Sequence, residues 1–209
     1  LPPDGAPPRI LPGLLDGALD PGPRIDDPRV ARDRGVRQAP VREALRDLAI
    51  LGSVEMKPHK GARVRKPTRE ELTQAIEVRA ELEALGGRLA AERRTEQCIV
   101  DLEMLYAAMD EAADRGDAHD QALNNTRFHA RIIAAAHNPT LERVWSMLEP
   151  FSRTYFTASV PGIDLHWLAV RHRSILDAIR DGDEDRAAEA MRIHASEAAG
   201  LIEGMPDDE

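Results

Sequence analysis

The sequence predicts a mainly helical protein of two domains: a small N-terminal domain of helices with one β-hairpin, and an antiparallel all-helical bundle after it. Aromatic residues make up only 3% of the chain, which favours packing of helices over a β-sandwich. Apolar residues recur at helical spacing through nearly all of the second part. The charge also divides the chain, because residues 1–66 carry 13 Lys and Arg against 9 Asp and Glu, whereas the remainder carries 15 against 28. We therefore expect domains at 1–66 and 67–209 that bind different partners.

Length and composition exclude several classes of protein. A chain of 209 residues is long enough to bury a core in each of two domains. Its one cysteine, Cys98, rules out an internal disulfide framework and is typical of a reducing compartment. No apolar run approaches the roughly 20 residues that span a bilayer, and the first residues lack the pattern of a signal peptide. We expect a cytoplasmic protein without a membrane segment, whose proline-rich residues 1–8 lack fixed structure.

The N-terminal domain is expected to consist of helices followed by a hairpin. Gly35 suits the end of a helix, where a left-handed conformation is needed, and Pro40 suits the first turn of the next one. That next helix has a buried face of apolar residues at helical spacing, at Val41, Leu45, Leu48 and Leu51. In chain order we expect helices near residues 10–18, 28–34 and 39–51, then strands at 54–57 and 62–65 around a turn at 58–61.

The polar face of the helix at 39–51 carries groups that bind nucleic acid. A short helix, a tight turn, a second helix and a hairpin form the layout of a winged helix-turn-helix, whose second helix enters the major groove of DNA. Gln38 makes a two-bond contact with adenine, whereas arginine prefers guanine. An ordinary solvated turn remains an alternative for the charges of the hairpin. The candidate DNA-binding residues are Arg37, Gln38, Arg42, Arg46, Lys60 and Gly61.

From Thr68 onward the sequence of the second domain predicts helix almost continuously. Thr68 and Glu71 form a capping box, with threonine at the N-cap and glutamate three residues later. Short breaks containing glycine, proline or aspartate then separate the apolar periodic segments. Helices joined by such short loops pack as an antiparallel bundle. We expect them near residues 68–92, 95–114, 117–136, 139–158, 164–180 and 184–203.

Both parts of the chain resemble one family of bacterial regulators. Residues 35–45, GVRQAPVREAL, resemble the recognition element of the GntR family of repressors. The bundle resembles the FCD effector domain found in the FadR-like branch of that family. The matching residues are Glu77-Val78-Arg79-x-x-Leu82-Glu83, Phe128-His129, Asn138-Pro139-x-Leu141, Arg171-His172-Arg173-x-Ile175-Leu176, Gly182-Asp183 and Met191-x-x-His194. The resemblance implies a transcription regulator, and because one recognition helix reads few base pairs, we expect a homodimer on a palindromic operator in double-stranded DNA.

Three histidines fall on three of the predicted bundle helices. Asn125 precedes His129 by four residues, so both lie on one helical face. His172 and His194 flank the turn at 181–183, and a hairpin that closes there brings them to similar depth. Three imidazoles and an amide oxygen suit Zn²⁺ or another late divalent first-row metal rather than Mg²⁺ or Ca²⁺. The alternative is that each histidine is an ordinary core or surface residue.

The family resemblance implies a metal site and also exposes one departure from it. The family pattern is Asp-x-x-x-His on one helix with one histidine on each of two later helices, and Asn125 stands here at the aspartate position. We expect a divalent transition metal at Asn125, His129, His172 and His194, zinc first, with nickel, manganese or iron as alternatives. A neutral amide leaves the net charge of such a site at about +2 instead of +1. Metal binding should weaken, and attraction for an anion should rise.

Two arginines are candidates for binding that anion. Arg79 lies among largely small or apolar positions of the helix at 68–92. One interpretation is an ion pair with a glutamate at the helix surface. The other is a guanidinium aimed into the bundle, where it holds a carboxylate through two parallel hydrogen bonds, and the resemblance favours this one. Arg153 is a weaker candidate of the same kind.

The sequence therefore predicts an effector-responsive DNA-binding repressor that senses a small organic acid through a pocket holding a divalent metal. Two alternatives remain open. One is a regulator of the same fold that binds its carboxylate effector without metal. The other is a metal-dependent enzyme, because three histidines with an open position form a catalytic zinc arrangement. No general acid or base accompanies the ligands, so we expect no enzyme.

Overall fold

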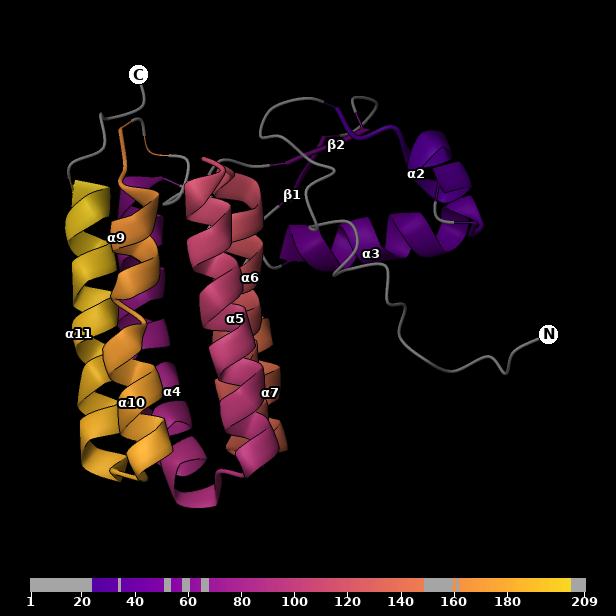
Figure 1. Ribbon diagram of the computed structural model, residues 1–209. Helices are drawn as coiled ribbons and strands as arrows, with labels where there is room; N and C mark the ends of the chain where they lie inside the picture. The colour runs from indigo at the N-terminus through magenta and orange to yellow at the C-terminus, as the bar shows by residue number, and fades with distance from the viewer. Residues whose placement is uncertain are drawn as a thin grey trace. The chain divides into compact units, whose positions relative to one another are not determined.

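The computed structural model describes residues 24–33, 35–50, 54–57, 61–64, 68–148, 160 and 162–203. The helix predicted at 10–18, and the candidate residues Lys60 and Arg153, lie outside this part of the chain. Contacts divide the protein into two compact units, one ending at Pro67 and the other beginning at Thr68. Each unit is described by itself (Figure 1). No helix in the described ranges is both long and apolar enough to cross a membrane.

In its described residues the N-terminal unit contains two helices and a β-hairpin, which correspond to the elements predicted at 28–34, 39–51, 54–57 and 62–65. Its elements are α2 (Asp27–Asp33), α3 (Gln38–Ile50), β1 (Val54–Lys57) and β2 (Gly61–Val64). The two strands pair antiparallel, with Val54 opposite Val64 and Lys57 opposite Gly61, so the second strand begins one residue earlier than expected. The apolar face of α3 packs against α2 and the hairpin in a small core of Ile25, Ala31, Val41, Ala44, Leu45, Val54 and Ala62.

The second unit is an all-helical bundle. Its described helices are α4 (Arg69–Arg93), α5 (Glu96–Asp114), α6 (Ala118–Ala135), α7 (Pro139–Ser146), α9 (Leu165–Val170), α10 (Arg173–Asp181) and α11 (Glu184–Glu203). The long helices α4, α5, α6 and α11 run roughly parallel to one another along the bundle (Figure 1). The last helix, α11, packs most extensively against α4, and α5 packs against α6. The fold class predicted from the sequence is therefore confirmed.

Local sequence signals fix the helix ends. The Thr68 hydroxyl accepts from Glu71 N at 3.2 Å, and the Glu71 carboxylate accepts from Thr68 N at 2.9 Å, which completes the predicted capping box. The Asn138 side chain caps α7 by accepting from the amides of the next turn. Gly182 ends α10 in the left-handed conformation at φ 73°.

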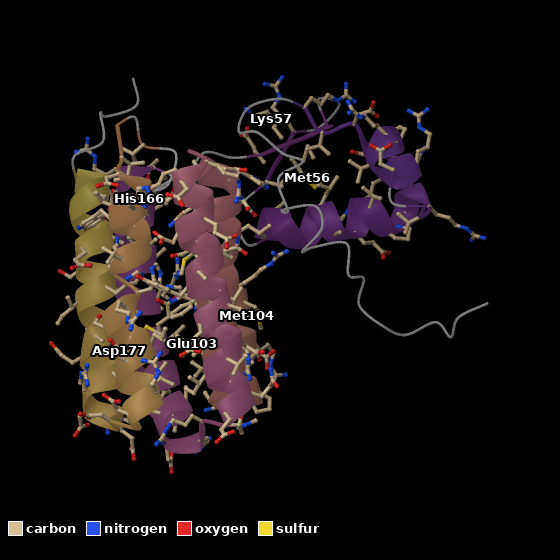
Figure 2. The ribbon with its side chains drawn as sticks, viewed as in Figure 1. Met56, Lys57, Glu103, Met104, His166 and Asp177 are labelled. Carbon is tan, nitrogen blue, oxygen red and sulfur yellow. The ribbon has the colours of Figure 1, made fainter. Side chains whose placement is uncertain are left out.

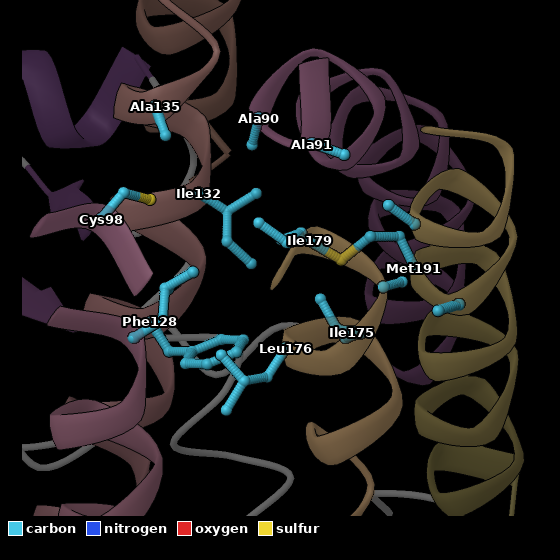
Figure 3. Close-up of a cluster of buried hydrophobic side chains, with 14 of the residues drawn as sticks. Ala90, Ala91, Cys98, Phe128, Ile132, Ala135, Ile175, Leu176, Ile179 and Met191 are labelled. Atoms are coloured by element: carbon cyan, nitrogen blue, oxygen red, sulfur yellow. The ribbon is translucent and has the colours of Figure 1, made fainter. Parts of the chain in front are cut away.

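The main core lies between α4, α5, α6, α10 and α11. Phe128 and Ile132 of α6 point toward Ile175 and Ile179 of α10, and Met191 of α11 closes the cluster from the other side (Figure 3). All five side chains are fully buried. Because this core joins α6, α10 and α11, it positions the three helical segments that carry the predicted metal ligands.

The single helix predicted over 164–180 was wrong, because the chain turns at Arg171 and His172 between α9 and α10. The Ala169 carbonyl accepts from His172 N at 3.1 Å and faces His172 Nδ1 at 3.2 Å. In a continuous helix this carbonyl would accept from the amide of Arg173. The turn allows two consecutive side chains to reach inward toward other helices, which an unbroken helix would place on different faces.

The helix predicted over 139–158 was too long, because α7 ends at Ser146 and a turn follows at residues 147–148. The Ser146 hydroxyl donates to the Arg143 carbonyl at 2.8 Å, in competition with the backbone hydrogen bonds of the last turn. Residues 149–159 lie outside the described part of the chain.

Two glycines with similar backbone conformations allow a test of this packing. Gly116 has φ 66° with open space around it, whereas a Cβ at Gly182 (φ 73°) would overlap the Arg94 guanidinium. Arg94 is held there by hydrogen bonds to the carbonyls of Ala91 and Arg180. Gly116→Ala should cost about 1–2 kcal/mol from the left-handed backbone alone. Gly182→Ala should cost about 1 kcal/mol more, because Arg94 must give up hydrogen bonds. Urea unfolding measures both, and equal losses would contradict the proposed role of Arg94.

Candidate metal and effector site in the helical bundle

A partly enclosed cavity lies inside the bundle between α4, α6, α9 and α11. Its volume is about 60 Å³, and since a water molecule needs roughly 10–15 Å³ of such space, it has room for a few waters or for the acid group of a small ligand. Charged, imidazole and amide groups line it together with apolar side chains such as Leu72, Ile76 and Ile202. The cavity therefore combines polar anchors with an apolar wall, as small-molecule sites do.

The three predicted histidines meet at this cavity. His129 comes from α6, His172 from the turn before α10, and His194 from α11, and one ring nitrogen of each lies within 4.8 Å of the others. His129 and His172 are 1% exposed, and His194 is 8% exposed. The ring centroids of His172 and His194 are 4.4 Å apart. The predicted gathering of these side chains is confirmed.

Two of the rings are oriented as metal ligands are. His172 Nδ1 lies 3.2 Å from the Ala169 carbonyl, which only accepts, so the ring proton belongs on Nδ1. His129 Nδ1 lies 3.4 Å from Glu83 Oε2, and a carboxylate oxygen likewise favours the proton at Nδ1. The Nε2 atoms of the two rings then face each other as lone pairs, 3.3 Å apart. A carbonyl or carboxylate behind each ligating ring is the usual support of a metal site.

That separation also fits a metal ion in size. Two nitrogens that each lie about 2.1 Å from a tetrahedral zinc ion are roughly 3.4 Å apart. Burial lowers the pKa of His172 and of His194 well below the ordinary histidine value, and the charge of Arg171 lowers both further. Both rings are therefore neutral near pH 7, which is the form that binds metals.

The third ring is held differently. Arg171 Nε donates to His194 Nδ1 at 3.2 Å, and the same guanidinium contacts the His194 carbonyl and Glu197 Oε2. A neutral imidazole that accepts at Nδ1 carries its proton on Nε2. His194 can therefore not offer an Nε2 lone pair to a metal until Arg171 moves. The Arg171 side chain is only 5% exposed, so its charge acts directly on the site.

A buried carboxylate organises the opposite wall. Glu83 accepts from Arg79 NH2 at 2.7 Å and from Trp145 Nε1 at 2.8 Å, and it lies beside His129. Burial alone would raise the pKa of Glu83, but the Arg79 guanidinium, His129 and the Trp145 N–H outweigh it, so that pKa lies well below its ordinary value. Glu83 is therefore ionised, and it draws Arg79 into the bundle.

Arg79 thus combines the two interpretations left open by its sequence. It forms an ion pair with a glutamate four residues later, but the pair lies inside the bundle, where the Arg79 side chain is 11% exposed, and not at the helix surface. Arg79 also lines the cavity, and so does Asn125, which is 8% exposed.

The predicted DNA-binding residues lie on the N-terminal unit. Arg37, Gln38, Arg42 and Arg46 are exposed at the start and along the polar face of α3. Arg42 Nε donates to Asp27 of α2 at 3.2 Å. Gly61 begins β2 at φ 79°, a conformation that favours glycine.

Comparison with known proteins identifies the family. The FCD domain model matches residues 74–197. A probable D-xylose utilization operon transcriptional repressor of Paenarthrobacter nicotinovorans is 34% identical over 187 residues, which cover 90% of this chain and 82% of that protein. The chain belongs to the GntR family. It falls in the FadR-like branch of that family, whose members carry an FCD domain, as the sequence predicts.

Other similar proteins agree with this assignment. The HTH-type transcriptional regulator McbR of Escherichia coli is 28% identical, over 82% of this chain and 79% of that protein. The solved structure of E. coli McbR/YncC superposes with a TM-score of 0.78 at 22% identity and covers 93% of both chains. These relatives are transcription regulators and not enzymes, so the GntR-family chain is a DNA-binding transcription regulator, and the expectation that it is no enzyme is confirmed.

Sequence reasoning missed three residues of the site in this GntR-family regulator: Glu83, Gln121 and Arg171. Glu83 follows Arg79 by four residues, a spacing that signals a helical ion pair, but nothing in the sequence shows that the pair is buried. Gln121 precedes Asn125 by four residues, and this same-face spacing was an available signal. Arg171 stands in one of the segments that resemble the FCD domain, but its inward direction could not be predicted, because it depends on the unpredicted turn. A fourth histidine of this unit, His166, does not belong to the site, since it is exposed on α9 (Figure 2).

The bond between Arg171 and His194 predicts that arginine opposes metal binding in this GntR-family regulator. Arg171→Met removes the donor and one positive charge, and should therefore raise the affinity for zinc by about tenfold or more. Competition against a chromophoric chelator measures the change. Arg88→Met is the matched control, because Arg88 of α4 likewise pairs with a residue of α11, Asp185, but does not line the cavity. An unchanged or lower zinc affinity in Arg171→Met would contradict the argument.

Proposed function

We propose that this GntR-family regulator is an effector-responsive repressor that senses a small organic acid in its bundle cavity. A divalent transition metal, zinc first, would be held by His129, His172 and His194, with Asn125 as a further ligand. Such a metal supplies positive charge and open coordination positions for a carboxylate. The observation that carries this proposal is the facing pair of Nε2 atoms, 3.3 Å apart, on rings whose Nδ1 atoms face oxygen acceptors.

Arg79 would bind the effector carboxylate from the opposite wall. Glu83 accepts from the Nε and NH2 groups of its guanidinium, and among the described residues no partner of NH1 is found, so its donors would be available to a ligand. The ion pair also fixes the direction of the side chain, so less conformational entropy is lost when the ligand binds. Arg153 remains a further candidate of the same kind.

The N-terminal unit would bind DNA as half of a homodimer. In this proposal Arg37, Gln38, Arg42 and Arg46 contact bases and phosphates in the major groove, while Lys60 and Gly61 belong to the wing. Two such units one turn of DNA apart would read a palindromic operator. The name of the Paenarthrobacter relative, a probable repressor, supports repression. The effector would act by binding with different affinity to dimers that are competent and incompetent for DNA binding.

A second candidate is a regulator of the same kind that binds its acid without metal. The bond from Arg171 to His194 Nδ1 favours it, because that bond keeps one of the three rings in the tautomer that does not ligate. Arg79, Arg171 and the histidines would then contact the carboxylate directly.

The deciding experiment measures DNA binding to the intergenic region upstream of the gene, at fixed salt, with a panel of small carboxylates before and after chelator. Specific binding that one acid alters, with a response that chelation abolishes, would establish the metal-dependent sensor. A response that survives chelation would support the metal-free candidate. If no acid in the panel alters specific binding, the proposal that the regulator senses an organic acid fails.

The asparagine at the usual aspartate position predicts cooperation between metal and acid. With a neutral amide, the acid carboxylate supplies part of the missing negative charge, so metal and acid should each strengthen binding of the other. Asn125→Asp should tighten zinc binding and reduce this mutual effect. Calorimetric titration of the responding acid, with and without zinc, measures both. Asn124→Asp is the control, because this substitution adds the same negative charge one residue away, at a side chain that does not line the cavity. Equal acid affinity with and without zinc in the parent would contradict the predicted cooperation.

A further inference from the structure

Gln121 is a buried amide whose donor group is not used. It lies on α6 with 1% of its surface exposed, and its Nε2 has no hydrogen-bond partner among the described residues. A buried donor without a partner is costly, and such groups are few in folded proteins. Glutamine at this position therefore has a reason other than stability of the ligand-free bundle.

The position of Gln121 indicates that reason, because the side chain lines the same cavity as Arg79 and the histidines. Gln121, Asn125 and His129 succeed one another at intervals of four residues, so they form one stripe along α6. Each interval advances about 6 Å along the helix axis. A ligand whose carboxylate lies near Arg79 and Asn125 would thus extend its next atoms toward Gln121.

The surroundings of Gln121 indicate which chemical group of the ligand could lie beside it. Among the described residues that line the cavity, the cationic side chains are Arg79 and Arg171. Arg79 bonds to Glu83, and Arg171 bonds to His194 and Glu197, so both belong to the end of the cavity that holds the imidazoles. A second carboxylate at Gln121 would be buried against a neutral amide, which is unfavourable. A hydroxyl both accepts and donates, so it satisfies the amide without needing a cation.

We infer that Gln121 is a specificity-determining residue, which selects acids that carry a hydroxyl group next to or near the carboxylate. This inference rests on the proposed acid-sensing function and adds a chemical class to it, the hydroxylated carboxylic acids. A site built to bond a hydroxyl rejects the analogue without it, because the buried amide is then left unpaired.

Two variants separate ligand binding from a structural role. Gln121→Met keeps the size and removes the unpaired amide, so the ligand-free protein should melt at the same temperature as the parent or higher. Asn124→Leu is the control on the same helix. Asn124 is also buried, but its amide bonds to Asp120 and Arg127, so that variant should melt lower while ligand selection stays unchanged.

The binding test uses two matched pairs of probes on the full chain: lactate with propionate, and gluconate with hexanoate. Calorimetric titration of the parent should show one hydroxy acid binding at least about tenfold tighter than its partner. Gln121→Met should remove that preference, because the affinity for the hydroxy acid should fall about tenfold while the affinity for the deoxy acid stays unchanged.

Three results would overturn the inference: a preference that survives in Gln121→Met, a lower melting temperature of that variant, or no preference for either hydroxy acid in the parent, including the case in which none of the four acids binds. The proposed function is judged separately, by the acid response of operator binding across the wider carboxylate panel. A response to some other acid would leave the sensor in place while removing Gln121 from its specificity.

Discussion

The site depends on one buried negative charge, the Glu83 carboxylate, which is 2% exposed. A charge removed from water must be compensated by its neighbours, and groups from three helices surround Glu83. Arg79 on the same helix α4 and Trp145 on α7 donate to it, and His129 on α6 lies beside it with Nδ1 3.4 Å from Oε2. Satisfying Glu83 therefore turns Arg79 inward and turns the Nε2 of His129 toward His172. Removing Glu83 would leave Arg79 buried without its partner and His129 without a fixed tautomer.

The remaining groups divide the cavity into parts with different chemistry. At one end two imidazoles are prepared for a cation, while Arg171 holds the third in the other tautomer. Asn125 and Gln121 continue along α6 as neutral amides. In our proposal a bound acid would balance the charge that asparagine leaves uncompensated, and Arg171 would take a different position when His194 binds the metal. Such a difference is the kind of local change that an allosteric regulator requires.

The sequence predicted the fold and the three histidines, but not the groups that tune them. Periodicity, the capping box at Thr68 and the glycine at 182 are local signals, and they located the other described helices to within a few residues, but not those predicted at 139–158 and 164–180. The meeting of His129, His172 and His194 followed from helix order. The turn at Arg171 did not, because it depends on a hydrogen bond from a side chain that other helices hold in place. Burial of the pair of Arg79 and Glu83, and the unpaired amide of Gln121, are properties of packing that no local pattern encodes.

The central claim is that the three histidines form one metal site. X-ray absorption on the chain, purified without an affinity tag and loaded with one equivalent of zinc, tests it most directly. Our account predicts one zinc per chain, with imidazole nitrogens at about 2.0–2.1 Å and loss of this signature in His172→Ala. Zinc that stays in solution, or that is bound equally well by His172→Ala, would contradict it.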